Sequence, residues 1–389
     1  MAYFADGIME LVKQEKQVQS CPVYQPLVEN LRTKIDNGLL KEGQQIPSET
    51  ELATRYRISR SSVRQGLNQL VKLGKVQKVG GKGTYVRTIN KFRPANLIGS
   101  SHKAISLIVP SIDDPFVAKI HTGIVQVLEN TNCNLSVRSS ENTSKLEATN
   151  LNQSIDHDSL GIILLPLWGL DNAAQVENLY GQGVPIVLVD RSIPNLSLDC
   201  VSTDNYRGTI IAIDYLVKMG HRKIGMIRGV SNSANDDRYN GYCASLQKHG
   251  IPFDKSLVVE QEYYDHGHEP ITGGQHEMTM LLEQAVRPTA VFVCNDVLAF
   301  GAEQTAIKMG FKVPDDISII GFDDLRHARL APVPLTTIHQ PAVEIGQTAA
   351  QLLLENIKTL TSGIKQKVQK IEFIPHLVIR QSVCQIQPQ

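Results

Sequence analysis

Two groups of polar side chains in this sequence have types and spacings suited to molecular recognition. In the first group, Arg60, Ser61 and Arg64 recur on one side of a predicted helix. Guanidinium and hydroxyl groups are donors that reach the phosphates and base edges of DNA. The other side of the same helix carries apolar residues at helical spacing, namely Val63, Leu67, Leu70 and Val71. The pattern predicts an amphipathic helix whose polar face binds nucleic acid.

The charge pattern around this helix supports that interpretation. Between Leu52 and Ile112 there is no Asp or Glu, against about a dozen Lys and Arg. The chain has 39 basic and 39 acidic residues in all, but the stretch from Met1 to Pro94 holds 16 basic and 8 acidic ones. The alternative is a small helical domain whose charged face is merely solvated. Such a face ordinarily carries both acidic and basic side chains. A face of one sign favours a polyanionic partner.

The second group of polar residues follows a series of predicted buried strands. Its members are Ser111 to Phe116, Asp190-Arg191, Asp237-Arg238, Asn295-Asp296, Asp323-Asp324 and Thr337 to Pro341. Carboxylates, amides and guanidinium groups give directional hydrogen bonds to sugar hydroxyls, each of which both donates and accepts. Helix capping is an equal explanation for Asp114, Asp296 and Asp324. Capping does not explain Arg238 or the Asp190-Arg191 pair, for which we expect ligand contact.

The elements that would position the first group form a winged helix-turn-helix domain. Ser48 and Glu51 have the spacing of a capping box, which predicts a helix from Glu49 to Tyr56. Ser59 would cap the next helix. Further elements expected here are a helix at Tyr24 to Leu40 and strands at Lys75 to Val79 and Thr84 to Arg87, joined by the glycine-rich turn Gly80 to Gly83.

From Lys103 onward, strands and helices alternate. The predicted strands are Ile105–Val109, Leu135–Arg138, Gly161–Leu167, Pro185–Val189, Lys223–Ile227, Val258–Gln261, Ala290–Cys294 and Ser318–Gly321. The predicted helices are Val117–Glu129, Lys145–Ile155, Ala173–Tyr180, Tyr206–Met219, Arg238–Lys248, Gln275–Gln284, Val297–Lys308 and Pro341–Ile357. This alternation predicts an α/β fold with parallel sheets, divided into two Rossmann-like lobes. Ligands bind at the carboxyl ends of such strands, so we expect a cleft between the lobes.

The sequence therefore predicts four segments. They are a polar N-terminal extension at 1–21, the winged domain at 22–88, a linker at 89–102 and the two-lobed domain at 103–389.

The winged domain resembles the DNA-binding domain of the GntR family of bacterial regulators. The resemblance rests on Pro47-Ser48-Glu49, Glu51-Leu52-Ala53, Ser59-Arg60, Val63-Arg64, Leu70, Gly74 and Gly81 to Val86. It implies DNA binding by Glu49, Arg60, Ser61, Ser62, Arg64, Gly81, Lys82 and Gly83, with the glycines letting the wing enter the minor groove. Two positions depart from the family pattern: Thr50 stands where Arg is usual, and Arg57 where Gly is usual.

The segment from Lys103 to about Val383 is similar to the effector domain of LacI-type repressors and to periplasmic sugar-binding proteins. The motifs that carry the similarity include Asp114-Pro115-Phe116, Val189-Asp190-Arg191, Arg238 to Tyr242, Asn295-Asp296, Gly321 to Asp324 and Pro334 to Pro341. By this similarity the effector contacts fall on Asp114, Phe116, Asp190, Arg191, Arg238, Asn295, Asp323 and Gln340. A GntR-type domain joined to a LacI-type domain resembles the arabinose-responsive repressor family.

Other chemistries find little support. The six cysteines are scattered, which is typical of reduced thiols in a cytoplasmic protein, and neither a signal peptide nor a membrane-spanning run is apparent. Gly80 to Thr84 lacks the spacing of a phosphate-binding loop. His266, His268 and His276 have no convincing fourth metal ligand. We expect no metal, no cofactor and no catalytic activity.

These observations predict a cytoplasmic, sugar-responsive transcriptional repressor that binds a two-fold DNA operator as a homodimer. Release of the operator by the sugar is implied by the resemblance alone. Two alternatives stay open: a sensor of purines or nucleosides with the same architecture, and a sugar-processing enzyme. The sequence does not identify the sugar, the operator or the role of the first 21 residues.

Overall fold

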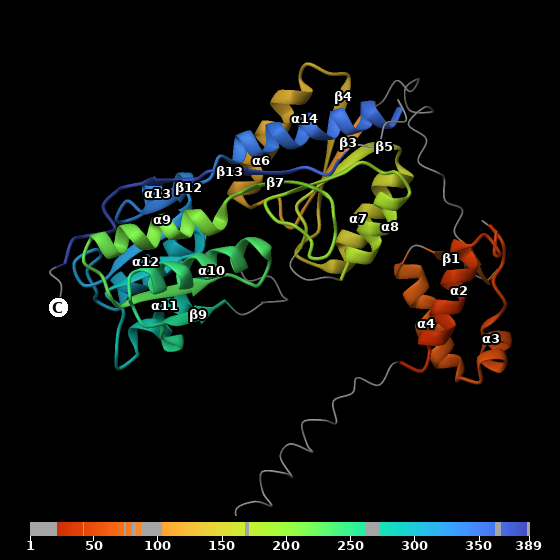
Figure 1. The fold of residues 1–389 in the computed structure, drawn as a ribbon, viewed down its shortest axis with the longest axis horizontal. Helices are drawn as coiled ribbons and strands as arrows, with labels where there is room; N and C mark the ends of the chain where they lie inside the picture. Colours follow the sequence, from red (N-terminus) through yellow and green to blue (C-terminus); the bar gives the residue numbers. More distant parts are fainter. Residues whose placement is uncertain are drawn as a thin grey trace, which may run out of the picture. The chain divides into compact units, whose positions relative to one another are not determined.

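The computed structural model describes residues 22–41, 43–73, 75–79, 83–86, 103–167, 171–261, 273–361 and 367–386. The chain divides into two compact units, Met1–Asn90 and Lys91–Gln389. In the described residues, the first unit combines helices with a two-stranded sheet, and the second contains two six-stranded sheets (Figure 1). The predicted N-terminal extension and linker lie outside the described residues.

The first unit has the helices and the hairpin of a winged helix-turn-helix domain. Its described elements are α2 (Gln25–Asp36), α3 (Glu49–Tyr56), α4 (Arg60–Lys72), β1 (Val76–Val79) and β2 (Gly83–Val86). The two strands pair antiparallel, as predicted. Each element contributes to one core, which includes Leu27, Leu52, Leu67, Val76 and Val86. Burying a side chain of this size stabilises the fold by about 1.5–3 kcal/mol.

The predicted caps of α3 and α4 are confirmed. The Ser48 hydroxyl accepts a hydrogen bond from the Glu51 backbone N–H, and the Glu51 carboxylate accepts one from the Ser48 N–H at 2.7 Å. Ser59 Oγ accepts from the Ser62 N–H at 3.1 Å. Arg57, between the two helices, has φ 53°. A non-glycine residue in this left-handed conformation bears a modest backbone strain.

Two predictions for this unit are wrong in detail. α2 ends at Asp36, four residues before the predicted Leu40, because the chain turns at Gly38 with φ 71°. Val71, predicted on the apolar face of α4, is 36% exposed, whereas Val63, Leu67 and Leu70 are buried. The buried stripe of α4 is therefore narrower than its apolar sequence pattern.

The first lobe of the second unit is a parallel sheet covered on both faces. Its strand order is β13-β7-β6-β5-β3-β4. The strands are β3 (Lys103–Val109), β4 (Cys133–Ser139), β5 (Ser159–Leu164), β6 (Ile186–Val189), β7 (Asp199–Thr203) and β13 (Lys370–Phe373). Helices α6 (Pro115–Leu128) and α14 (Ala342–Thr361) share one core with the sheet, and α7 (Ser144–Asp156) and α8 (Ala173–Gly181) pack on the other side.

The second lobe repeats this plan with the order β14-β12-β11-β10-β8-β9. Its strands are β8 (Ile224–Arg228), β9 (Val258–Glu260), β10 (Ala290–Val293), β11 (Ser318–Asp323), β12 (Thr336–His339) and β14 (His376–Val378), of which β14 is antiparallel to β12. Helices α9 (Asn205–Lys218) and α10 (Ser233–Lys248) cover one face, and α11 (Gln275–Leu282) and α12 (Asp296–Lys308) cover the other. The predicted α/β class with two parallel-sheet lobes is confirmed.

The chain passes between the lobes after β7, after β12 and after β13. The sequence pattern did not predict β7, β12, β13 or β14, nor the short helix α13 (Arg326–Leu330). These elements are short, and β7 and β12 consist largely of polar residues. The start of α10 was also placed too late: the helix begins at Ser233, capped by Asn232, so Arg238 lies within it.

Two glycines let α6 and α14 approach each other closely, and Figure 1 shows the two helices running side by side. A Cβ atom added at Gly346 would lie 2.1 Å from the Ile120 carbonyl oxygen, and one at Gly123 would lie 2.0 Å from the Val343 carbonyl oxygen. Both distances are far shorter than a van der Waals contact. The first lobe therefore depends on glycine at both positions of this crossing.

We predict that Gly346→Ala destabilises the second unit by about 1–3 kcal/mol, because the helices must separate to accept the methyl group. Gly181→Ala is the matched control: an added Cβ there meets no described heavy atom within 4 Å. This control should be neutral or slightly stabilising, since alanine restricts the unfolded chain. Urea unfolding of both variants measures the difference, and equal stabilities would contradict the prediction.

Glu303 is a buried carboxyl in α12 with one unsatisfied oxygen. Its side chain is fully buried; Oε1 accepts a hydrogen bond from the Val333 N–H, whereas Oε2 has no partner among the described residues. Burial raises the pKa of Glu303 to about 7. In the unfolded chain a glutamate titrates near pH 4.3, so between the two pH values the folded protein retains a proton that the unfolded chain has released.

The free energy of unfolding of the protein therefore falls as the pH rises between the two pKa values of Glu303, that of the unfolded chain and that of the folded protein. Glu303→Gln keeps the acceptor for Val333 but cannot ionise. We expect it to stabilise the protein by about 1–3 kcal/mol at pH 8 and to have little effect at pH 5. Urea unfolding at the two pH values tests this, and a difference that does not depend on pH would refute it.

Candidate functional site

The polar face of α4 is presented to solvent. Arg60, Ser61 and Arg64 are exposed and Ser62 is half-buried. The first turn of α4 contains no acidic residue, so its backbone N–H groups and arginines together favour a phosphate. Ser61 Oγ and Ser62 Oγ lie 2.7 and 2.9 Å from Ser59 Oγ, which ties both hydroxyls to the cap of the helix.

Helix α3 holds the two arginines of α4 in place. Arg64 Nη2 donates to Glu49 Oε2 at 2.9 Å and Arg64 Nε donates to Glu49 Oε1 at 3.3 Å. The hydrogen bond from Arg64 lowers the pKa of Glu49, so the pair is ionised near neutral pH. Arg60 Nη2 donates to the Thr50 hydroxyl. Glu49 therefore orients an arginine, a role that fits its negative charge better than contact with a phosphate.

The wing is described only in part. Gly81 and Lys82, two predicted DNA contacts, lie outside the described residues. Gly83 has φ 114°, a conformation in which a side chain would be strained. Lys78 Nζ on β1 donates to Asn68 Oδ1 on α4 at 2.7 Å, which connects the hairpin to the helix.

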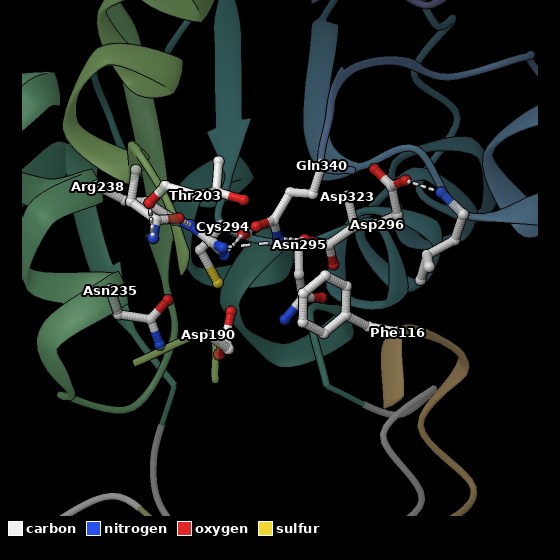
Figure 2. A network of polar contacts seen from close by, with 12 residues as sticks. Phe116, Asp190, Thr203, Asn235, Arg238, Cys294, Asn295, Asp296, Asp323 and Gln340 are labelled. Carbon is white, nitrogen blue, oxygen red and sulfur yellow. Dashed lines mark hydrogen bonds and ion pairs between the residues drawn. The ribbon is translucent and has the colours of Figure 1, made fainter. Parts of the chain in front are cut away.

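In the second unit, Arg238 forms the centre of a buried polar cluster (Figure 2). Its side chain extends from α10 and is only 6% exposed. Nε donates to Asn205 Oδ1 at 2.8 Å, and Nη1 donates to the Cys294 carbonyl at the end of β10. The guanidinium also lies 3.9 Å from the centre of the Phe322 ring, a cation–π contact.

Asp323 faces Arg238 from the end of β11. The distance from Asp323 Oδ1 to Arg238 Nη2 is 3.9 Å, and Gln340 Nε2 donates to the same oxygen at 2.6 Å. Burial raises the pKa of Asp323 well above its usual range, although Arg238 opposes this shift. The structure thus brings together three predicted residues, Arg238, Asp323 and Gln340.

The first lobe contributes a second pair. Asp190 follows β6 with φ 67°, and Arg191 Nε donates to Asp190 Oδ2 at 3.0 Å. In Figure 2, Asp190, Asn295 and Phe116 lie below the cluster that Arg238 forms with Asp323 and Gln340. Phe116 is 7% exposed and belongs to the first-lobe core, so little of its ring is accessible. No hydrogen bond between described residues joins the Asp190-Arg191 pair to the Arg238 cluster.

Two predicted contacts are helix caps. Asp114 Oδ1 accepts from the Phe116 N–H at the start of α6, and Asn295 Oδ1 accepts from the Leu298 N–H at the start of α12, each at 2.8 Å. Asp114 is exposed, although desolvation by neighbouring protein atoms raises its pKa. A capping oxygen retains a second lone pair, and the Asn295 amide N–H groups are not used by the cap.

Three buried polar atoms of this region have no protein partner among the described residues: Gln340 Oε1, Thr203 Oγ1 and Arg191 Nη1. Buried polar atoms are nearly always paired, so these three are candidates for contact with a ligand. Thr203 and Asn205 were not among the predicted site residues, because the strand that ends at Thr203 was missed. This strand, Asp199 to Thr203, is only five residues long and contains only two apolar residues, so its sequence pattern does not reveal it.

No group of three or more His, Cys, Asp or Glu able to hold a metal ion occurs among the described residues. His266 and His268 lie outside them. The five described cysteines are free thiols, and burial raises the pKa of Cys200 and Cys294 to about 12. No helix in the described ranges has the length and apolar character needed to cross a membrane.

Comparison with known proteins agrees with both resemblances. Residues 23–86 match the family of bacterial regulatory proteins of the gntR type, and residues 213–383 match a periplasmic binding protein-like domain. The arabinose metabolism transcriptional repressor of Geobacillus stearothermophilus is 29% identical over 95% of this chain and 99% of its own length. The ribose operon repressor of Haemophilus influenzae is 32% identical over 72% of this chain and 81% of its own.

Among solved structures, a LacI family transcriptional regulator from Enterococcus faecium with bound ribose superposes with a TM-score of 0.63 and 28% identity. It covers 73% of this chain and all of its own. The fold and these similarities define a ligand-responsive, DNA-binding transcriptional repressor rather than an enzyme. The chain belongs to the family of bacterial repressors with a LacI-type effector domain, and its DNA-binding domain is of the GntR type.

We predict that Glu49→Ala weakens binding to a specific operator, although it removes a negative charge from the α4 side of the domain. Without Glu49, Arg64 loses its fixed orientation. If Arg64 contacts a guanine, Arg64→Ala should cost about 1–3 kcal/mol of operator binding. Glu49→Ala should cost part of that amount. Fluorescence anisotropy with a duplex selected from a random pool measures both.

The control is Glu29→Ala, which removes an exposed acid from α2 of the same unit. A scrambled duplex separates specific from nonspecific binding. If Glu49 merely repelled phosphates, Glu49→Ala would tighten binding to both duplexes, and that result would contradict the assigned role.

Proposed function

We propose that this repressor binds a sugar of pentose size between its two lobes and that the sugar lowers operator affinity. The observation that carries the proposal is the cluster of Arg238, Asp323 and Gln340, which is prearranged and retains an unpaired acceptor in Gln340 Oε1. A guanidinium and a carboxylate held side by side can donate to one hydroxyl of a vicinal diol and accept from the next.

Residues of the first lobe would complete the site. Asp190 and Arg191 supply another carboxylate and guanidinium, and Arg191 Nη1 has no described protein partner. The names of the Geobacillus stearothermophilus and Haemophilus influenzae relatives, together with the ribose bound in the Enterococcus faecium structure, point to a pentose. We therefore infer arabinose or ribose as the first sugars to test.

A nucleobase or nucleoside is the alternative, and relatives named PurR are 30–37% identical to the parts of this chain that they match. Bases are held largely by stacking on aromatic rings. Phe116 is mostly packed in the core, and the Phe322 ring is occupied by the Arg238 guanidinium. The polar, hydroxyl-matching cluster therefore favours a sugar.

We further propose that the protein acts in the cytoplasm as a homodimer on a two-fold operator, with one winged domain at each half-site. Large apolar side chains are exposed on the neighbouring helices α11, α12 and α13, at Met280, Ile307 and Leu330. Exposed apolar residues mark an interface only where they form a contiguous patch, so these helices are the first surface to test for one. Analytical ultracentrifugation tests the dimer, and a monomer at operator-binding concentrations would exclude it.

The sugar is identified by a thermal-shift panel of pentoses, hexoses and nucleosides, since binding to the folded state raises its apparent stability. Operator titrations with the best ligand then measure the response. If no sugar shifts the melting temperature or operator affinity and a nucleoside does both, the sugar proposal fails.

We predict that Arg238→Ala abolishes the sugar response and that Arg238→Lys weakens sugar binding by at least about tenfold, because lysine cannot reproduce the planar fork of donors. Operator binding without sugar should change less than about twofold in both variants, since Arg238 lies outside the winged domain. Arg222→Ala, at an exposed arginine of the same lobe, is the control. A normal sugar response in Arg238→Ala would remove this residue from the site.

A further inference from the structure

The three consecutive residues Asp323, Asp324 and Leu325 make contacts in three different directions. The Asp323 carboxylate faces Arg238 and Gln340, in the cluster proposed to bind the sugar. Asp324 and Leu325 contact other parts of the unit, including the first lobe. This segment at the end of β11 therefore lies between the polar cluster of Arg238 and the contacts with the first lobe.

Asp324 joins both lobes through different atoms. Its carbonyl oxygen accepts a hydrogen bond from Lys119 Nζ, on α6 of the first lobe, at 2.8 Å. Its carboxylate accepts from Arg380 Nη2 and lies 3.0 Å from His339 Nδ1, both in the second lobe. The carboxylate thus anchors Asp324 to its own lobe, while the carbonyl is held by the other.

Leu325 adds an apolar connection to the same lobe. Although it follows a strand of the second lobe, its side chain is 1% exposed and belongs to the first-lobe core with Phe116 and Val117. Its backbone N–H donates to Asp296 Oδ2 at 2.8 Å. Asp323 is therefore connected within two residues to contacts in the first lobe.

The backbone of the segment is strained. The φ angles of Asp323 and Asp324 are 115° and 51°, and non-glycine residues rarely adopt positive φ. Such conformations persist where surrounding contacts hold them, and they concentrate at switch regions. Here the Lys119 and Arg380 contacts hold the segment on either side.

We propose that Lys119 is a positioning residue that couples the sugar site to the first lobe through the Asp324 carbonyl. The inference rests on the sugar-binding function proposed above. Lys119 touches no predicted effector contact through a described hydrogen bond, so it acts on the coupling rather than on the ligand. Its helix, α6, follows β3, the first described element after the segment that leads from the DNA-binding unit.

The test compares Lys119→Met with wild type in calorimetric sugar binding and in operator titrations with and without saturating L-arabinose or D-ribose. The ratio of the two operator dissociation constants measures the coupling. We expect this ratio to fall about 2- to 30-fold in Lys119→Met, with sugar affinity of the DNA-free protein changed less than about twofold. Lys119→Arg, which keeps a charged donor, should recover part of the ratio. Lys145→Met, at an exposed lysine of α7, should match wild type.

An unchanged ratio in Lys119→Met would overturn the inference while leaving the proposed function standing. If no sugar of the thermal-shift panel binds the wild type, the proposed function fails, and the inference is decided without sugar by amide hydrogen exchange. Lys119→Met should then raise exchange both in residues 323–330 and in α6, and Lys145→Met should raise neither. Exchange that rises in only one of the two segments, or in neither, would refute the link.

Discussion

The burial of the Arg238 guanidinium is the constraint on which the effector-binding unit depends. Removing a full charge from water costs several kcal/mol unless its donors find acceptors. Three groups offset the charge here: two hydrogen-bond acceptors, Asn205 at the start of α9 and the Cys294 carbonyl after β10, and an ion-pair partner, Asp323 at the end of β11. The last two lie together because β10 and β11 are neighbours in one parallel sheet whose carboxyl ends share an edge, whereas Asn205 follows β7 of the other sheet. A charge satisfied in this way fixes the geometry of the edge where a ligand would bind.

The DNA-binding unit handles its charges in the opposite manner. Arg64 is 63% exposed and its partner Glu49 is 31% exposed, so the pair contributes little to stability because water and salt screen it. The pair instead orients Arg64, because the hydrogen bonds to the carboxylate restrict its side chain to fewer rotamers. The net positive charge of this unit attracts a polyanion over a long range. The two arginines held by α3 determine where donor groups are placed once the partner is in direct contact.

The sequence predicted the elements whose patterns are local and long, and missed those that tertiary structure creates. The capping box of α3 and most of the larger elements of the two lobes follow from periodicity and cap residues. β7 escaped prediction because Asp199–Thr203 contains only two apolar residues, yet all five positions are buried. With β7 missed, Asn205 at its end could not be placed beside Arg238. The Glu49–Arg64 pair is likewise invisible in the sequence, because 15 residues and a turn separate its partners.

The path of the backbone explains why aspartate is suited to both positions 323 and 324. In a regular strand, Asp323 and Leu325 would point to one face of the sheet and Asp324 to the other. Positive φ at both aspartates ends the strand and redirects each side chain separately, so that neighbouring residues reach Arg238, Arg380 and the first-lobe core. Aspartate is among the few non-glycine residues that tolerate such a conformation, and glycine would supply no carboxylate. The backbone geometry and the chemistry of the contacts therefore select the same residue type twice in succession.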